Sequence, residues 1–149
     1  RDYPCLFGDL ALLRVLRGNG NDLKQAADWF ARCLTKVEEC NLDQVVLDMT
    51  HCLDESLTMV PLDSMLPHQD DIQEYVRAVF SAPKLTPSGD LVNYISFARF
   101  DMWKMIARMK WEHWVSYMRG ATVMRMIECD RQSRLQGRLV RVVTIIDVA

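Results

Sequence analysis

Apolar residues recur every three or four positions through the first third of the chain, which is the period of an amphipathic α-helix. Residues 9–17 place three leucines on one face, and the Gly-Asn-Gly run at residues 18–20 ends the pattern. Either Asn21 or Asp22 is suited to cap the next helix, whose apolar period continues to about Cys40. The sequence therefore predicts two consecutive amphipathic helices joined by a tight turn.

Two further helical patterns follow, at residues 42–53 and 70–80, and Pro61 and Pro67 indicate an irregular connection between them. A helical core is expected where the apolar faces of the first two helices meet. The side chains predicted to be buried together there are Leu12, Leu16, Phe30 and Leu34.

The pattern changes in the second half of the chain, after a loop rich in Pro and Gly. The β-branched and aromatic residues at 91–98 predict a strand. Asp101 opens a long helical region at residues 101–131, and Gly137 breaks the helical pattern. Residues 139–148 are nearly continuous in apolar and β-branched side chains, which is typical of a strand covered on both faces. This order predicts a parallel βαβ unit, and hence an α/β fold class that is mostly helical.

Composition narrows the class of protein. The 149 residues are 50% apolar and 26% charged, and the net charge of −2 gives no overall attraction to nucleic acid. The first residue is Arg1, the first ten residues show no secretory signal, and no apolar run reaches the roughly 20 residues that span a bilayer. We therefore expect an intracellular protein that is soluble or peripheral to a membrane.

The cysteines and histidines suggest neither a metal centre nor an enzyme. Five cysteines without a CxxC pair indicate free thiols in a reducing compartment. Cys40, His51 and Cys52 lack the paired spacing of a zinc site, and His68 and His113 lie on separate segments. The sequence has no GxSxG, GxxxxGK[ST], GxGxxG or HExxH motif, so we expect no catalysis and no cofactor beyond a bound hydrophobic ligand.

Four segments in order resemble the CRAL-TRIO (Sec14-like) lipid-binding and transfer family. LLRVLRGNGNDLKQAADWFARCL (12–34) resembles the family's N-terminal helical module, and GDLVNYISFARFDMW (89–103) resembles the first strand of its lipid-binding domain. KWEHWVSYMR (110–119) and VRVVTIIDVA (140–149) resemble a later helix and the central strand. The chain departs from the family pattern at Lys36-Val37, where the family often has Trp-Arg, and at Ala98, where Gly is usual.

The resemblance implies a division into two parts and a non-catalytic function. Residues 1–82 would form a three-helix CRAL-TRIO-N-like module, and residues 83–149 a partial, truncated βαβ lipid-binding domain. The implied function is the binding and transfer of a lipid or other hydrophobic small molecule. The implied lipid-pocket wall consists of Tyr94, Ile95, Phe97, Val143, Ile145 and Ile146. The alternative for these six side chains is ordinary core of an α/β sheet.

Arginines and tryptophans in the second half suggest contacts with a headgroup, a membrane or a partner. Arg131, Arg134 and Arg138 belong to a basic sector that would hold an anionic headgroup or an acidic partner, or would be a solvated surface. Trp103, Trp111 and Trp114 would lie at a membrane interface or join a core.

The competing function is a structural one. A two-stranded parallel sheet leaves unpaired edges and exposed faces, which further chain or a protein partner would cover. The chain would then be a docking subunit of a larger assembly that has lost lipid transfer.

Overall fold

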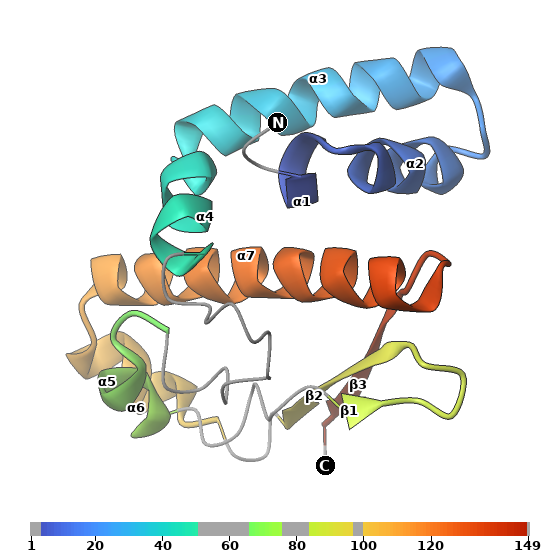
Figure 1. Ribbon diagram of the computed structural model, residues 1–149. Coiled ribbons are helices and arrows are strands. Elements are labelled where there is room, and N and C mark those ends of the chain that lie inside the picture. Colours follow the sequence, from blue (N-terminus) through green and yellow to red (C-terminus); the bar gives the residue numbers. More distant parts are fainter. Residues whose placement is uncertain (1–3, 51–65, 76–83, 97–99, 149) are drawn as a thin grey trace.

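The computed structural model describes residues 4–50, 66–75, 84–96 and 100–148, which form mostly helices beside one small sheet (Figure 1). The helices are α1 (Pro4–Phe7), α2 (Asp9–Gly18), α3 (Leu23–Glu39), α4 (Leu42–Thr50), α5 (Gln69–Gln73), α6 (Met102–Arg108) and α7 (Trp111–Gln136). The predicted domain boundary at residues 82–83 lies outside the described residues, as do Cys52, His51, Phe97 and Ala98.

The first two predicted helices are confirmed, and local chemistry explains where they begin and end. Gly20 and Asn21 have positive φ angles of 65° and 64°, which reverse the chain between α2 and α3. The Asp22 carboxylate accepts a hydrogen bond of 3.0 Å from the backbone N–H of Gln25 and caps α3. Asn41, with a φ of 48°, separates α3 from α4.

The later helices differ from the prediction in two ways. Helix α5 ends at Gln73, within the helix predicted at 70–80, and residues 76–80 of that prediction lie outside the described residues. The single region predicted at 101–131 is two helices, because Met109 and Lys110 are extended. Asp101 caps α6 by accepting a 3.0 Å hydrogen bond from the N–H of Lys104, and Gly137 ends α7 with a φ of 61°.

The break lets α6 pack beside α5 instead of extending α7. The backbone N–H of Asp101 donates to the carbonyl oxygen of Tyr75 over 3.0 Å. The ammonium of Lys104 lies 2.7 Å from a carboxylate oxygen of Glu74. These contacts join residues distant in the sequence, so a periodicity argument does not reveal them.

The sheet contains the predicted parallel pair. Strands β2 (Leu91–Ser96) and β3 (Val142–Asp147) are parallel, with Leu91 opposite Val142 and Ser96 opposite Asp147. A third strand, β1 (Lys84–Leu85), pairs antiparallel with β2 and gives the order β1-β2-β3. Two residues are too few for a periodic signal, and the sequence did not predict β1.

The prediction that the last strand is covered on both faces is wrong for the described residues. The apolar side chains of β3 are between 39% and 54% exposed, and they lie on both faces of the strand. An apolar run shows that a strand is suited to burial, but the neighbouring elements decide whether burial occurs.

The main hydrophobic core surrounds α7 rather than the α2–α3 pair. Val123 of α7, Val46 of α4 and Ile72 of α5 are almost fully buried in one cluster. Gly120 admits a close approach, because a Cβ there would lie only 2.9 Å from Cδ of Pro67. The segment before α5 is therefore packed directly on α7.

The predicted core of Leu12, Leu16, Phe30 and Leu34 is wrong in part. Leu12 and Leu34 are 43% and 40% exposed, while Leu16 and Phe30 are half-buried. Helices α2 and α3 form a separate layer along one side of α7 (Figure 1), with α1 and α4 making further contacts between the layers. The apolar face of α2–α3 borders a cavity instead of meeting a filled core.

Burial predicts which apolar side chains support the fold. The side chain of Ile72 is 1% exposed, so Ile72→Ala should lower the free energy of unfolding by about 2–5 kcal/mol. Leu23 is 76% exposed, and Leu23→Ala should change it by less than about 0.5 kcal/mol. Urea unfolding measures the free energy of unfolding of both variants. An equal change in Ile72→Ala and Leu23→Ala would contradict the placement of the core.

Candidate functional site

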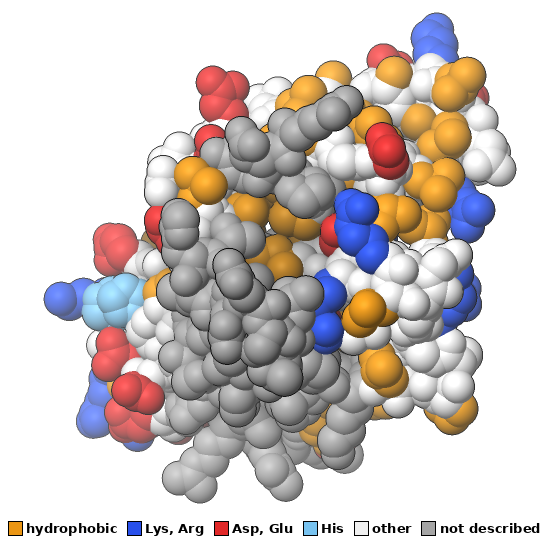
Figure 2. Space-filling view, viewed as in Figure 1, with side chains coloured by type: hydrophobic (Ala, Val, Ile, Leu, Met, Phe, Trp, Pro, Cys, Tyr) orange, Lys and Arg blue, Asp and Glu red, His pale blue; other side chains and the backbone are white. Residues whose placement is uncertain are grey.

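An apolar cavity of about 500 Å³ lies between α1–α3 and the pair formed by α7 and β3. Figure 2 shows hydrophobic side chains gathered over α2 and α3. Apolar side chains that line the cavity include Leu6, Ala11, Val15, Phe30, Val37 and Met126. Both its volume and its apolar lining are typical of small-molecule sites.

Arg14 of α2 is one of two guanidinium groups at the cavity wall. Its Nη2 donates to the carbonyl oxygen of Cys129 over 2.9 Å and to Oγ of Ser133 over 2.7 Å. Its Nε is buried and has no hydrogen-bond partner among the described residues. A buried donor without a partner is unfavourable unless an acceptor reaches it.

Arg125 of α7 is the second guanidinium at the wall. Its Nε donates to the carbonyl oxygen of Ala121 over 3.1 Å. Burial lowers the pKa of Arg125, because the apolar surroundings disfavour the charged form. An anionic group in the cavity would offset this desolvation and would also accept hydrogen bonds.

Ser133 holds the Arg14 side chain and the start of the last strand segment together. Its hydroxyl donates to the carbonyl oxygen of Cys129 over 2.6 Å. The hydroxyl oxygen of Ser133 also accepts a hydrogen bond from Arg14 and another, over 2.9 Å, from the backbone N–H of Val140. One buried hydroxyl thus links α2, α7 and the chain leading into β3.

Three cysteines line the cavity, and burial raises the pKa of two of them. Desolvation by burial raises the pKa of Cys5 to about 11, and it also raises the pKa of Cys129. Cys33 lines the cavity as well and is free. The thiols of Cys5 and Cys129 are protonated at neutral pH and act as small apolar groups.

None of the five predicted pocket-wall residues that the structure describes lines this cavity. Val143, Ile145 and Ile146 are exposed, Tyr94 and Ile95 are half-buried on β2, and Phe97 is outside the described residues. The cavity is lined instead by Val142 and Thr144 of β3. Alternation along a strand places these two on the face opposite Val143 and Ile145, so the pattern left the choice of face open. A lipid contact at the six predicted residues stays a prediction.

The three predicted headgroup arginines are all engaged in ion pairs. Arg131 contacts Glu128 through two hydrogen bonds of 2.6 and 2.8 Å, and Arg134 lies 2.7 Å from Asp130. Arg138 lies 2.9 Å from Asp90. An external anion at these arginines would have to compete with the carboxylates, and such a contact stays a prediction.

Asp90 is an acidic partner that the sequence did not reveal, because it precedes Arg138 by 48 positions. Its buried side chain accepts from Arg138 and, over 3.1 Å, from the backbone N–H of Arg141. The hydrogen bond from Arg138 and that from Arg141 lower the pKa of Asp90 to about 2. Asp90 therefore anchors the β1–β2 turn to the chain leading into β3.

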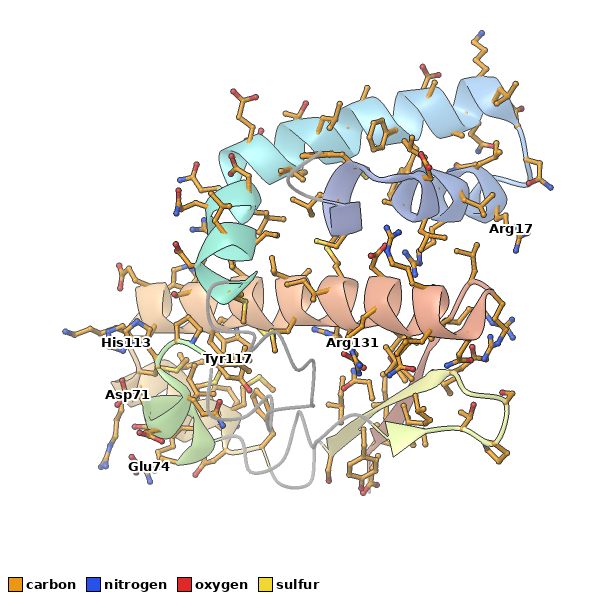
Figure 3. The ribbon with its side chains drawn as sticks, in the orientation of Figure 1. Arg17, Asp71, Glu74, His113, Tyr117 and Arg131 are labelled. Atoms are coloured by element: carbon orange, nitrogen blue, oxygen red, sulfur yellow. The ribbon has the colours of Figure 1, made fainter. Side chains whose placement is uncertain are left out.

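A second cluster of polar side chains lies where α5 meets α7. His113 Nδ1 lies 3.1 Å from Oδ2 of Asp71, and the His68 ring stacks on the His113 ring. Figure 3 shows His113 near one end of α7, close to Asp71 on α5. His68 and His113 lie on separate segments, as the sequence indicates, but the fold brings their rings together, and His51 lies outside the described residues.

Comparison of the chain with protein-family models, curated proteins and solved structures finds no match. Among the described helices, none is both long enough and apolar enough to cross a membrane.

The lowered pKa of Asp90 predicts how stability depends on pH. As the pH falls from about 4 toward 2, the unfolded chain takes up a proton at this group before the folded chain does. The stabilisation from Asp90 is therefore complete above about pH 4 and is lost as the pH approaches 2. Asp90→Asn should be less stable at pH 7 and should show a smaller loss of stability across this range.

Urea unfolding at a series of pH values measures this dependence. Arg138→Gln should also reduce the slope, because Arg138 is the main cause of the low pKa. If the free energy of unfolding of both variants changed with pH as much as that of the wild type, Asp90 would not be the source of the pH dependence.

Proposed function

We propose that this chain binds one amphiphilic hydrophobic molecule, of the lipid class, in the cavity between α1–α3 and α7, without covalent chemistry. The cavity is the main observation that supports this proposal. Its volume of about 500 Å³ lies within the roughly 300–1,000 Å³ of small-molecule sites, and most of its lining is apolar. Burial of an alkyl chain there would contribute about 25 cal/mol per Å² of apolar surface.

The charges at the wall favour a ligand with one anionic group. Arg14 and Arg125 both reach the cavity, and the buried Nε of Arg14 has no hydrogen-bond partner among the described residues. A carboxylate or phosphate near Arg14 would give its buried Nε an acceptor. A fatty acid or an acidic phospholipid combines such a headgroup with an apolar tail.

The CRAL-TRIO resemblance supports the same ligand class. The resemblance implies a helical front end, then a strand, one long helix and a second strand, and in the structure α2 and α3 precede β2, the helices α6 and α7, and the parallel strand β3. We propose membership of this family, and with it transfer of the ligand between membranes. The proposed site differs from the implied one, because α2, α3 and α7 supply most of its wall.

Exposed tryptophans offer a route to a membrane surface. Trp103 of α6 and Trp111 at the start of α7 are 84% and 68% exposed. Ile106, which lies on α6 with Trp103, is also exposed. Indole rings favour the boundary between lipid and water, so this surface is the proposed peripheral contact during ligand exchange.

The exposed strand β3 favours a second candidate function, docking to another polypeptide. Val143, Ile145 and Ile146 present apolar side chains to solvent at the edge of the described sheet. Exposed apolar edges also associate with copies of themselves. Sedimentation should therefore show association of the wild type that Ile145→Lys abolishes, and a monomer in both proteins would contradict this candidate.

Filling the cavity tests ligand binding directly. Ala11 is buried at the cavity wall, so Ala11→Phe should occupy part of the volume and weaken lipid binding at least about tenfold. Ala31 is exposed on α3, and Ala31→Phe is the matched control that should bind as the wild type does. Native mass spectrometry of co-purified lipid and displacement of a fluorescent fatty acid measure binding. Equal binding by both variants would contradict the site.

Removing one charge tests the ligand class. Arg125→Gln should lower the affinity for laurate about tenfold, because a hydrogen bond to a charged group contributes about 1.5–3 kcal/mol. The affinity for uncharged dodecanol should change little, and Arg125→Lys should retain most of the laurate affinity. Titration calorimetry measures all six values, and a parallel loss for both ligands would contradict an anionic preference.

A further inference from the structure

Three side chains from two elements converge at the junction of α5 and α7. Nδ1 of His113 lies 3.1 Å from Oδ2 of Asp71, and Nδ1 of His68 lies 3.9 Å from the same oxygen. The two imidazole rings are 3.8 Å apart between centroids, and their planes differ by 5°. Each residue offers a ligand atom, and these atoms lie within 4.8 Å of one another.

The spacing suits a small divalent transition-metal ion. Zinc binds nitrogen and oxygen ligands at about 2.0–2.1 Å, so two ligands of a tetrahedral site are about 3.3 Å apart. The observed separations of 3.1 and 3.9 Å lie on either side of that value. The lone pairs of the two stacked rings lie in parallel planes and do not converge, so binding requires the His68 ring to turn out of the stack until both nitrogens face the ion. Two imidazoles and one carboxylate are also an established ligand set for such metals.

Packing holds the backbone of the three residues in place. Leu66 and Ile72, which flank His68 and Asp71, are buried in the main core. Pro67 packs on Gly120 of α7, where a Cβ would be too close. Ligands on a backbone fixed in this way bind a metal with little loss of conformational freedom.

The backbone of His68 is a second, independent sign of a constrained site. Its φ of 56° lies in the left-handed region, which residues other than glycine seldom adopt. Such conformations persist where the surroundings impose them, and they cluster at ligand sites. Here the conformation accompanies the stacking of the His68 ring on His113, a residue from another helix.

Neighbouring charges leave Asp71 as the carboxylate available to the site. Glu74, on the next turn, is engaged by Lys104 at 2.7 Å. Asp70 is exposed in the first turn of α5 and is not among the clustered ligand atoms. The pair of stacked imidazoles would repel each other if both were protonated, whereas a shared metal ion uses the lone pair of each ring.

We infer that His68, Asp71 and His113 bind a divalent transition-metal ion of the zinc class, which links α5 to the first turn of α7. Three protein ligands leave a fourth position for water or for a group from a partner. The site is distinct from the apolar cavity, which α7 borders further along at Thr122, Arg125, Met126 and Cys129.

Titration calorimetry with ZnCl₂ and thermal unfolding test the inference on the whole chain. Zinc should raise the melting temperature of the wild type, because binding favours the folded state. His113→Ala, His68→Ala and Asp71→Asn should each weaken binding at least about tenfold. Asp70→Asn is the matched control, since it removes a neighbouring exposed carboxylate, and it should bind zinc as the wild type does.

Cobalt substitution separates this site from the five thiols of the chain. Co²⁺ bound to His68, Asp71 and His113 should give visible d–d bands without the near-ultraviolet charge-transfer band of a thiolate ligand. His113→Ala should abolish these bands, while circular dichroism confirms that the variant is folded. A thiolate band that persists in His113→Ala, or equal zinc affinity in all four variants, would overturn the inference.

Discussion

The hydrogen bonds at Ser133 hold the two helical layers and the sheet in one arrangement. Its oxygen accepts from Arg14 of α2 and from the backbone N–H of Val140, and its hydroxyl donates within α7. Arg14 adds a second bond to the carbonyl oxygen of Cys129. Because these polar groups are satisfied at the edge of an apolar cavity, α2 stays close to α7 although few side chains fill the space between them. The cavity and the entry into β3 both depend on this contact.

Elements controlled by local chemistry were predictable from the sequence. Asp22 and Asp101 accept the hydrogen bonds that begin α3 and α6, and Gly137 ends α7 in a left-handed conformation. The parallel pairing of β2 with β3 follows from a strand, a helical crossover and a second strand. The break at Lys110 was not predictable, since it places α6 beside residues about thirty positions earlier, as the Lys104–Glu74 ion pair shows. Helix propensity does not encode such contacts.

The candidate sites were less predictable than the fold because they combine residues from distant segments. Alternation along β3 separates Val142 and Thr144 from Val143 and Ile145, but only the position of α2–α3 selects the face that borders the cavity. Asp71 and His113 are 42 positions apart and meet because α5 packs on α7. Arg14 was visible as part of LLRVLR, yet its partners Cys129 and Ser133 are more than a hundred residues away. The type of a side chain indicates which groups it can bind, whereas tertiary packing decides which residues it contacts.

The unfilled space beside α7 itself favours a binding function. A core packed at normal density would be more stable, because each missing contact loses dispersion energy and each cavity surface raises the free energy. Here Phe30 and Val37 border the cavity, and the guanidinium of Arg14 faces it with a buried Nε that has no partner in the part of the chain that the structure describes. A ligand with an apolar chain and an anionic end would pack against these apolar side chains and would give the Nε of Arg14 an acceptor. Binding would therefore stabilise the fold, and it would account both for the exposure of Leu34 and for the buried Nε of Arg14.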